Sequence, residues 1–155
     1  MQDGTIGRRY ARALALVLGD GADAAASLKA FQQVESELSG LAELLEQRSG
    51  NNDFRQAMLN PIFSADLRQK VLKDVADAHG FHAVTRQVLA LLVTKERFQY
   101  LSSIASAFQN EVDERVGRVR AQITSARVLD DAAVKQIVAA LEKRTGKKVV
   151  PELEV

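Results

Sequence analysis

The spacing of apolar residues changes once along this chain, and the change divides it into a helical part and a part that contains strands. In the first part apolar residues recur every three or four positions, which is the period of an amphipathic helix. From Arg118 to Ala126 they alternate with polar residues, as Val119 and Ile123 show, and this alternation is typical of a half-buried strand. We therefore expect two modules, residues 1–116 and residues 117–155.

Six helices are expected in the first module, because Gly, Pro and short polar residues interrupt the helical pattern at intervals. The expected helices cover residues 6–18, 24–47, 53–59, 65–78, 82–95 and 97–116. The second helix has the longest apolar stripe, which consists of Leu28, Phe31, Val34, Leu38, Leu41 and Leu45. This stripe predicts a helix that packs one face against the rest of a bundle.

Residues with capping side chains mark the ends of these helices. Asp53 and Ser64 are expected to cap the third and fourth helices, because their side-chain oxygens accept hydrogen bonds from unpaired backbone N–H groups. Gly80 is expected to end the fourth helix. The first and second helices are expected to end at residues 19–21 and 49–52, where Gly, Asp and Asn are frequent.

The expected helix at 82–95 is apolar over more than half of its circumference. Its apolar residues include Val88, Leu89, Leu91, Leu92 and Val93. A helix of this kind is either buried at the centre of a bundle or carries a second apolar face for a partner. The residue pattern alone leaves both interpretations open.

The second module is expected to contain a strand at 118–126, a helix, and a second strand at 148–155. Asp130 or Asp131 is expected to cap the helix. Pro151 lies inside the second strand and favours an edge position, since proline has no N–H to donate. The expected fold class is therefore mainly α, with an N-terminal six-helix bundle followed by a small, incomplete α+β module.

This strand–helix–strand module is too small to be stable alone. Ordering each residue costs about 1–2 kcal/mol of entropy, and two strands with one helix bury little apolar surface in return. We expect the module to be completed by more chain, by a partner or by docking on the bundle. We also expect sequence downstream of Val155 to be missing.

Composition excludes several classes of protein. The chain has no Cys, so a disulfide framework, a thiol nucleophile and a cysteine metal site are excluded. Its 21 basic and 20 acidic residues nearly balance, which argues against a protein that coats nucleic acid or an anionic membrane. No apolar run approaches the length of a membrane span, and the N-terminus lacks the apolar core of a signal peptide.

Two polar clusters are candidates for chemistry, and neither has the spacing that a site needs. His79 and His82 lie near Asp77, but Gly80 interrupts the helix and no fourth ligand is evident, so a turn between helices is favoured. Gly146 and the two lysines after it follow a helix, whereas a phosphate-binding loop precedes one. We therefore expect no catalytic residue, no metal site and no cofactor.

Three arginines on the first helix form a basic face. Arg8, Arg9 and Arg12 could contact RNA, and they motivate an alternative function, an RNA-binding antitermination factor resembling the NusB type of helical bundle. The strand–helix–strand module and the balanced charge argue against this alternative. A solvated basic face and no nucleic-acid partner are therefore the favoured interpretation.

Several short segments follow one another in an order that carries a resemblance. They are Arg9-Tyr10-Ala11-Arg12-Ala13-Leu14, then Leu59-Asn60-Pro61-Ile62-Phe63, then Leu92 through Phe108, then Ala121-Gln122-Ile123-Thr124-Ser125-Ala126 and Gly146-Lys147-Lys148-Val149. In this order and spacing the chain resembles the delta subunit of the F-type ATP synthase, which is called the oligomycin-sensitivity-conferring protein in mitochondria.

The resemblance implies a role as a non-catalytic stator subunit. The helical domain would bind N-terminal helices of the alpha subunits in the catalytic head, and the C-terminal part would bind the b subunits of the peripheral stalk. The implied location is peripheral, on the cytoplasmic face of the bacterial inner membrane. Carried over to this chain, the groove for the alpha-subunit helix would be formed by Tyr10, Ala13, Leu14, Val88, Leu91 and Leu92.

The chain departs from the family pattern at its end. Family members usually continue past the second strand into a hairpin that contains Gly-Gly, and this chain stops at Val155. The resemblance is therefore to a C-terminally truncated member, in which binding to the head depends on residues before Val116.

Overall fold

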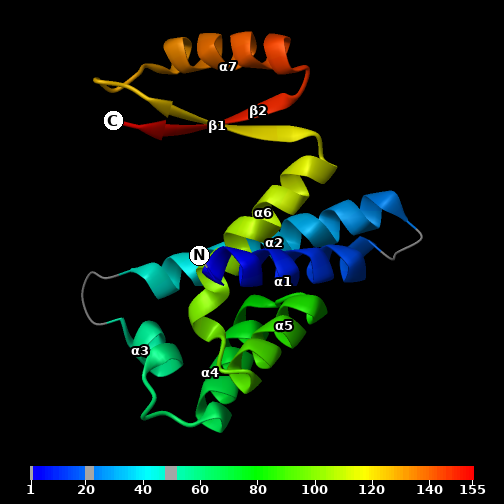
Figure 1. Ribbon diagram of the computed structural model, residues 1–155, viewed down its shortest axis with the longest axis vertical. Coiled ribbons are helices and arrows are strands. Elements are labelled where there is room, and N and C mark those ends of the chain that lie inside the picture. The colour runs from blue at the N-terminus through cyan, green and yellow to red at the C-terminus, as the bar shows by residue number, and fades with distance from the viewer. Residues whose placement is uncertain (1, 20–22, 48–51) are drawn as a thin grey trace. The chain divides into compact units, whose positions relative to one another are not determined.

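The computed structural model describes residues 2–19, 23–47 and 52–155, and Figure 1 shows their course. The chain divides into two compact units, Met1–Val112 and Asp113–Val155. The first unit is helical, and the second contains a helix and two strands. This confirms the expected fold class, a helical bundle followed by a small strand–helix–strand module. The division falls inside a helix, whereas the sequence places it after residue 116.

Helices of the first unit agree with the expected ones in number and order. Their bounds are α1 Gln2–Gly19, α2 Ala24–Glu46, α3 Asp53–Leu59, α4 Ala65–His79, α5 Ala83–Thr94 and α6 Leu101–Arg115, with a 3₁₀ turn at Phe98–Tyr100 before α6. The last helix was expected to start at 97, and this is wrong because residues 98–100 form the tighter turn. The expected ends of the first two helices fall mostly on residues 20–22 and 48–51, outside the described residues.

Capping side chains explain where several helices begin, and a left-handed glycine explains where α4 ends. Ser64 caps α4 through a hydrogen bond from Leu67 N–H, and Gly80 ends α4 in the left-handed conformation, as expected. The expected cap at Asp53 is wrong. The N-cap of α3 is Asn52, because its side-chain oxygen accepts a hydrogen bond from the N–H of Arg55, at 2.9 Å.

The core of the first unit is built from large apolar side chains. Phe31 of α2 stacks on Phe108 of α6 with ring centroids 5.9 Å apart, and both side chains are buried. The buried stripe of α2 consists of Phe31, Val34, Leu38, Leu41, Ala42 and Leu45. It starts one turn later than expected, since Leu28 is 40% exposed.

The second unit is a two-stranded parallel sheet with a helix between its strands. Strand β1 is Arg118–Thr124, helix α7 is Asp131–Thr145, and strand β2 is Lys148–Glu154. The register runs from Arg118 opposite Lys148 to Thr124 opposite Glu154. Asp130 caps α7, and Gly146 ends it with a φ of 67°. Within this unit Val149 and Asp113 are the buried residues.

The outer edge of β2 offers few donors to another strand. Lys148 N–H donates to the Gly117 carbonyl, so alternate residues from Lys148 onwards bond to β1, and Val149 and Pro151 face the outer edge. The Val149 N–H is taken by the side chain of Glu142 at 3.0 Å, and Pro151 has no N–H. The expected edge position of Pro151 is therefore confirmed.

Candidate helix-binding groove

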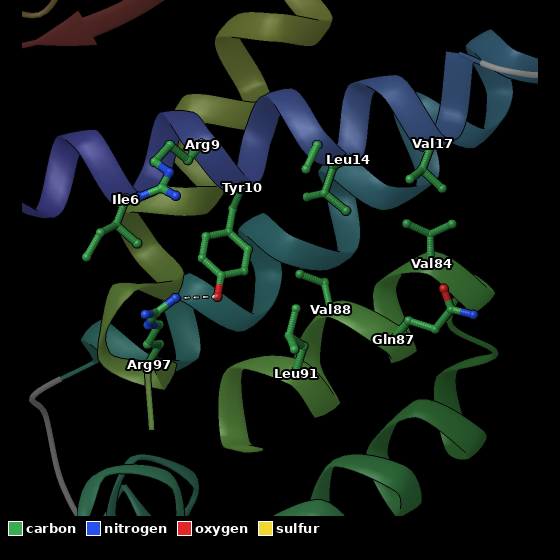
Figure 2. Close-up of a pocket in the computed structure, with 11 residues that line it drawn as sticks. Ile6, Arg9, Tyr10, Leu14, Val17, Val84, Gln87, Val88, Leu91 and Arg97 are labelled. Atoms are coloured by element: carbon green, nitrogen blue, oxygen red, sulfur yellow. Dashed lines mark hydrogen bonds between the residues drawn. The ribbon is translucent and has the colours of Figure 1, made fainter. Parts of the chain in front are cut away.

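A groove of about 520 Å³ runs between α1 and α5 (Figure 2). Helix α1 supplies one wall with residues three or four positions apart, which lie on one face of a helix. Helix α5 supplies the other wall in the same way, and one residue follows the end of α5. The lining residues are Ile6, Arg9, Tyr10, Ala13, Leu14, Val17, Val84, Gln87, Val88, Leu91 and Arg97.

Most of the groove surface is apolar. Leu14 and Val88 are buried at the contact between the two helices, whereas Val17 and Leu91 are 59% and 44% exposed. Figure 2 shows Val17 across from Val84 and Leu14 across from Val88, so both helices direct apolar side chains into the same hollow. Exposed large apolar side chains that share a concave surface indicate a surface that binds another molecule.

Small residues on the inner face of α1 bring this helix close to α6. A Cβ placed on Gly7 would lie 2.6 Å from the backbone oxygen of Ser103, which is closer than Cβ atoms are found in proteins. Ala11 and Ala15 continue this row at a spacing of four, and both are buried. The close contact of small residues fixes the position of α1, and its larger side chains, such as Tyr10, line the groove.

Helix α5 is anchored at its start by a carboxylate from α2. Glu37 accepts a hydrogen bond from the N–H of His82 at 3.0 Å and another from the hydroxyl of Thr85, which is buried. His82 caps α5 itself, since its Nδ1 accepts a hydrogen bond from the N–H of Val84. A negative charge at this helix N-terminus is also favoured by the helix dipole.

Arg86 connects α5 to the end of α4. Its guanidinium donates hydrogen bonds to the carbonyl oxygens of Ala76 and Phe81, at 2.9 and 3.1 Å, and pairs with the carboxylate of Asp77 at 2.5 Å. The hydrogen bond from Arg86 holds the pKa of Asp77 below its ordinary value, and the positive charges of Arg86 and Lys73 act in the same direction. Arg86 therefore fixes the α4–α5 turn.

The end of α5 folds back and places an arginine at the groove. The N–H of Arg97 donates to the carbonyl of Leu92 at 2.8 Å and that of Glu96 to Val93 at 3.1 Å, which is the bond pattern of a Schellman motif. Glu96 takes the left-handed position of the motif, with a φ of 53°. Arg97 Nη1 then donates a hydrogen bond to the Tyr10 hydroxyl at 3.3 Å (Figure 2).

The resemblance assigns six residues to a groove for a helix, and five of them are found in the lining of the α1–α5 groove. These five are Tyr10, Ala13, Leu14, Val88 and Leu91. Leu92 does not line the groove, and it is 0% exposed. Successive helix residues lie about 100° apart, so Leu92 faces the core when Leu91 faces the groove. Ile6, Val17 and Val84 continue the same stripes at spacings of three or four, and this signal could have found them in the sequence.

The histidines have structural roles. His79 stacks on Phe81 with ring centroids 6.1 Å apart, and His82 caps α5. Within residues 2–19, 23–47 and 52–155 no group of three or more His, Cys, Asp or Glu is placed to hold a metal ion. In the same ranges no helix has both the length and the apolar composition needed to cross a membrane.

A helical bundle with an open apolar groove and a strand–helix–strand unit is the architecture of a protein that binds a partner through a surface, and no catalytic cluster is evident among the described residues. Comparison with known proteins identifies the family. The sequence profile of the ATP synthase delta (OSCP) subunit matches residues 6–155, and the chain belongs to this family. It is a delta-type subunit of the F-type ATP synthase, a structural and non-catalytic part of that complex.

Individual relatives are similar in sequence to this protein over nearly the whole chain. It is 37% identical to the ATP synthase subunit delta of Desulfosudis oleivorans over 153 residues, which are 99% of this chain and 78% of the relative. It is 36% identical to that of Trichlorobacter lovleyi over 155 residues, which are 100% of this chain and 81% of the relative. The family match therefore favours the stator interpretation over the RNA-binding alternative.

A solved structure supports the same assignment. The chain matches a chain in the cryo-EM structure of the Toxoplasma gondii mitochondrial ATP synthase hexamer with a TM-score of 0.71 and 25% sequence identity. The match covers 99% of this chain and 78% of the other. The delta-type subunit is a peripheral component of a membrane complex.

Proposed function

We propose that this chain holds the catalytic head of the ATP synthase to the peripheral stalk. The first unit binds an N-terminal helix of an alpha subunit in the α1–α5 groove. The second unit binds the b subunits of the stalk, on the cytoplasmic face of the bacterial inner membrane. The link keeps the head from turning with the rotor, so that rotation driven by proton transport is coupled to ATP synthesis.

The α1–α5 groove is the observation that carries this proposal. It extends along α1 from Ile6 to Val17, which is about 16 Å at 1.5 Å per residue and corresponds to three turns of a bound helix. Its exposed apolar side chains suit a helix whose own apolar residues recur at i, i+3, i+4 and i+7. The groove therefore has the length and surface chemistry for a short amphipathic helix.

Binding to the b subunits is supported by family membership. In the second unit Arg120 pairs with the buried carboxylate of Asp113 at 2.6 Å and lies 3.5 Å from the exposed carboxylate of Glu152. We expect the whole chain to bind the soluble part of a b-subunit dimer in a sedimentation or calorimetric measurement. Absence of binding to b by a chain that still binds the alpha-subunit helix would contradict this half of the proposal.

The groove is tested by titrating the whole chain with a synthetic peptide that copies an alpha-subunit N-terminal helix. Leu91→Asp places a charge in the groove and is expected to weaken binding about thirtyfold or more, since loss of a central apolar anchor costs about 2 kcal/mol or more. Leu44→Asp is the control. Leu44 is 42% exposed, close to the 44% of Leu91, and lies in the last turn of α2 outside the groove.

The two variants separate the possible outcomes. Saturable binding that Leu91→Asp weakens about thirtyfold or more and Leu44→Asp preserves supports the proposal. If the folded wild-type chain does not bind the peptide, or if both variants weaken binding equally, the assignment of this groove is wrong. Circular dichroism of each variant checks that the helical fold is retained.

A further inference from the structure

Charge is distributed unevenly along the groove. Arg9 and Arg97 are the two charged residues among the eleven that line it, and no carboxylate is among them. Figure 2 shows both arginines toward the end marked by Ile6, whereas the other end is formed by Val17, Val84 and Gln87. One end of the groove is therefore cationic and the other is uncharged.

The two arginines have unused hydrogen-bond donors. A guanidinium has five N–H donors, and Arg97 directs one of them to the neutral hydroxyl of Tyr10. Neither Arg9 nor Arg97 is ion-paired with a carboxylate in the part of the chain that the structure describes. Both side chains are exposed, so their charge is available to a molecule that enters the groove.

Arg97 is also held in place by the backbone. The Schellman motif at the end of α5 fixes its main chain, and the bond to Tyr10 directs its guanidinium along the groove. A cation that is held before binding loses less conformational entropy when it meets an anion. Arginine also matches a carboxylate with two parallel hydrogen bonds, which fixes the position of the partner.

We propose that Arg9 and Arg97 select the direction in which a helix lies in the groove. The preferred partner is an amphipathic helix of about three turns with Asp or Glu next to one end of its apolar stripe. That acidic end lies at Arg9 and Arg97, and the apolar stripe continues toward Val17. The inference rests on the proposed function, because it assigns the orientation of the helix that the groove binds.

The test uses the whole chain and versions of the alpha-subunit helix peptide. The residues that flank the apolar stripe are set to Glu, Gln or Lys at one end and then at the other. We expect Glu at one end to bind about tenfold more tightly than Lys at that end, and changes at the opposite end to alter binding less than about threefold. Equal affinities for all versions would overturn the inference and leave the groove assignment intact.

Charge-reversal variants identify which arginines select the direction of the bound helix. Arg9→Glu is expected to weaken binding of the Glu peptide about tenfold and to strengthen binding of the Lys peptide. Arg12→Glu, an exposed position on the same helix that does not line the groove, gives the control for net charge and is expected to have little effect. If Arg12→Glu has the same effect as Arg9→Glu, general charge attraction explains the result and the inference is wrong.

Orientation is measured directly with a spin label on the acidic end of the bound peptide. We expect the label to broaden the NMR signals of Ile6 and Arg97 much more strongly than those of Val17 and Val84. Broadening at the Val17 end, or at both ends equally, would overturn the proposed direction. If no peptide version binds at all, the proposed function fails together with the inference, and this outcome is distinct from binding without a preferred direction.

Discussion

The hydroxyl of Thr85 donates a hydrogen bond to the carboxylate of Glu37, although the two residues are 48 positions apart in the sequence. Thr85 is fully buried at the start of α5, and Glu37 lies on α2. The N–H of His82 donates to both oxygens of the same carboxylate, at 3.0 and 3.2 Å. One side chain of α2 therefore fixes the start of the helix that forms half of the groove.

Removing this carboxylate is expected to destabilise the first unit. Glu37→Ala leaves the buried Thr85 hydroxyl and the His82 N–H without these acceptors, which costs about 1–3 kcal/mol. Urea unfolding followed by circular dichroism measures the loss. Glu43→Ala, at an exposed position on the same helix, is expected to change the free energy of unfolding by about 0.5 kcal/mol or less. Equal losses in both variants would contradict the role of Glu37.

Gly7→Ala is expected to destabilise the bundle, although alanine favours helices. The added Cβ would meet the backbone of Ser103, which cannot move as a flexible side chain would, and such overpacking costs about 1–3 kcal/mol. The gain in helix propensity offsets about 1 kcal/mol of this cost.

The control for this prediction is Gly40→Ala in α2, where a Cβ would meet nothing within 4 Å. We expect Gly40→Ala to raise the free energy of unfolding by about 0.5–1 kcal/mol. Thermal and urea unfolding of the two variants should therefore differ in sign. If Gly7→Ala stabilises the chain as much as Gly40→Ala does, α1 and α6 are not in tight contact at this point.

Glu96→Gly is expected to stabilise the protein. Glu96 has a φ of 53°, and this left-handed conformation costs a residue with a Cβ about 1–2 kcal/mol. Glycine removes this cost, but it also makes the unfolded chain more flexible, and this flexibility offsets part of the gain in stability. We expect a net gain of about 0.5–1 kcal/mol in urea unfolding. Glu96→Ala keeps the Cβ and should bring no such gain, so a similar gain in both variants would point to the charge of Glu96 instead.

The lowered pKa of Asp77 predicts that the stability of the first unit depends on pH. The pKa of Asp77 lies below the ordinary value of 3.8 because Arg86 donates a hydrogen bond to the carboxylate. A lowered folded-state pKa contributes stability above the ordinary pKa, and this contribution is lost as the pH falls through the folded-state value. The wild-type chain should therefore exceed Asp77→Asn in stability at neutral pH, and the difference should shrink below about pH 4.

Urea unfolding at a series of pH values measures this difference. Asp74→Asn on the same helix is the control, because no ion pair joins Asp74 to another of the described residues. Its difference from the wild type should vary less over the same pH range. A constant difference between the wild type and Asp77→Asn down to about pH 3 would contradict the role of the ion pair.

Local signals in the sequence predicted the helices well and the details of their ends less well. Ser64 and Gly80 were found because caps act over three or four residues. Asn52 was missed in favour of Asp53, since both side chains can cap and only the backbone geometry decides between them. The break at residue 96 was placed between the expected helices at 82–95 and 97–116, but the left-handed conformation of Glu96 was not expected, because no glycine marks the position.

The apolar periodicity of the sequence could not show which apolar residues of the helix at 82–95 face the core and which face the candidate site. Val88, Leu91 and Leu92 are all apolar, and the sequence left open whether their helix is central or has a second face for a partner. The structure shows both situations in one helix. Leu92 lies in the core and Leu91 faces the groove. Arg97 lines the groove because the chain folds back at the end of α5, and the spacing of residues in the sequence does not predict this fold.

The sequence by itself determined the helical bundle, the change to strands after it and the family, because periodicity, caps and ordered motifs are local properties of the chain. Only the tertiary structure decided which apolar side chains remain exposed and which polar groups meet. Tyr10 meets Arg97 and Glu37 meets Thr85 across long stretches of sequence. Such contacts depend on how whole helices pack, and packing is set by the sum of many contacts across the core and not by any single segment.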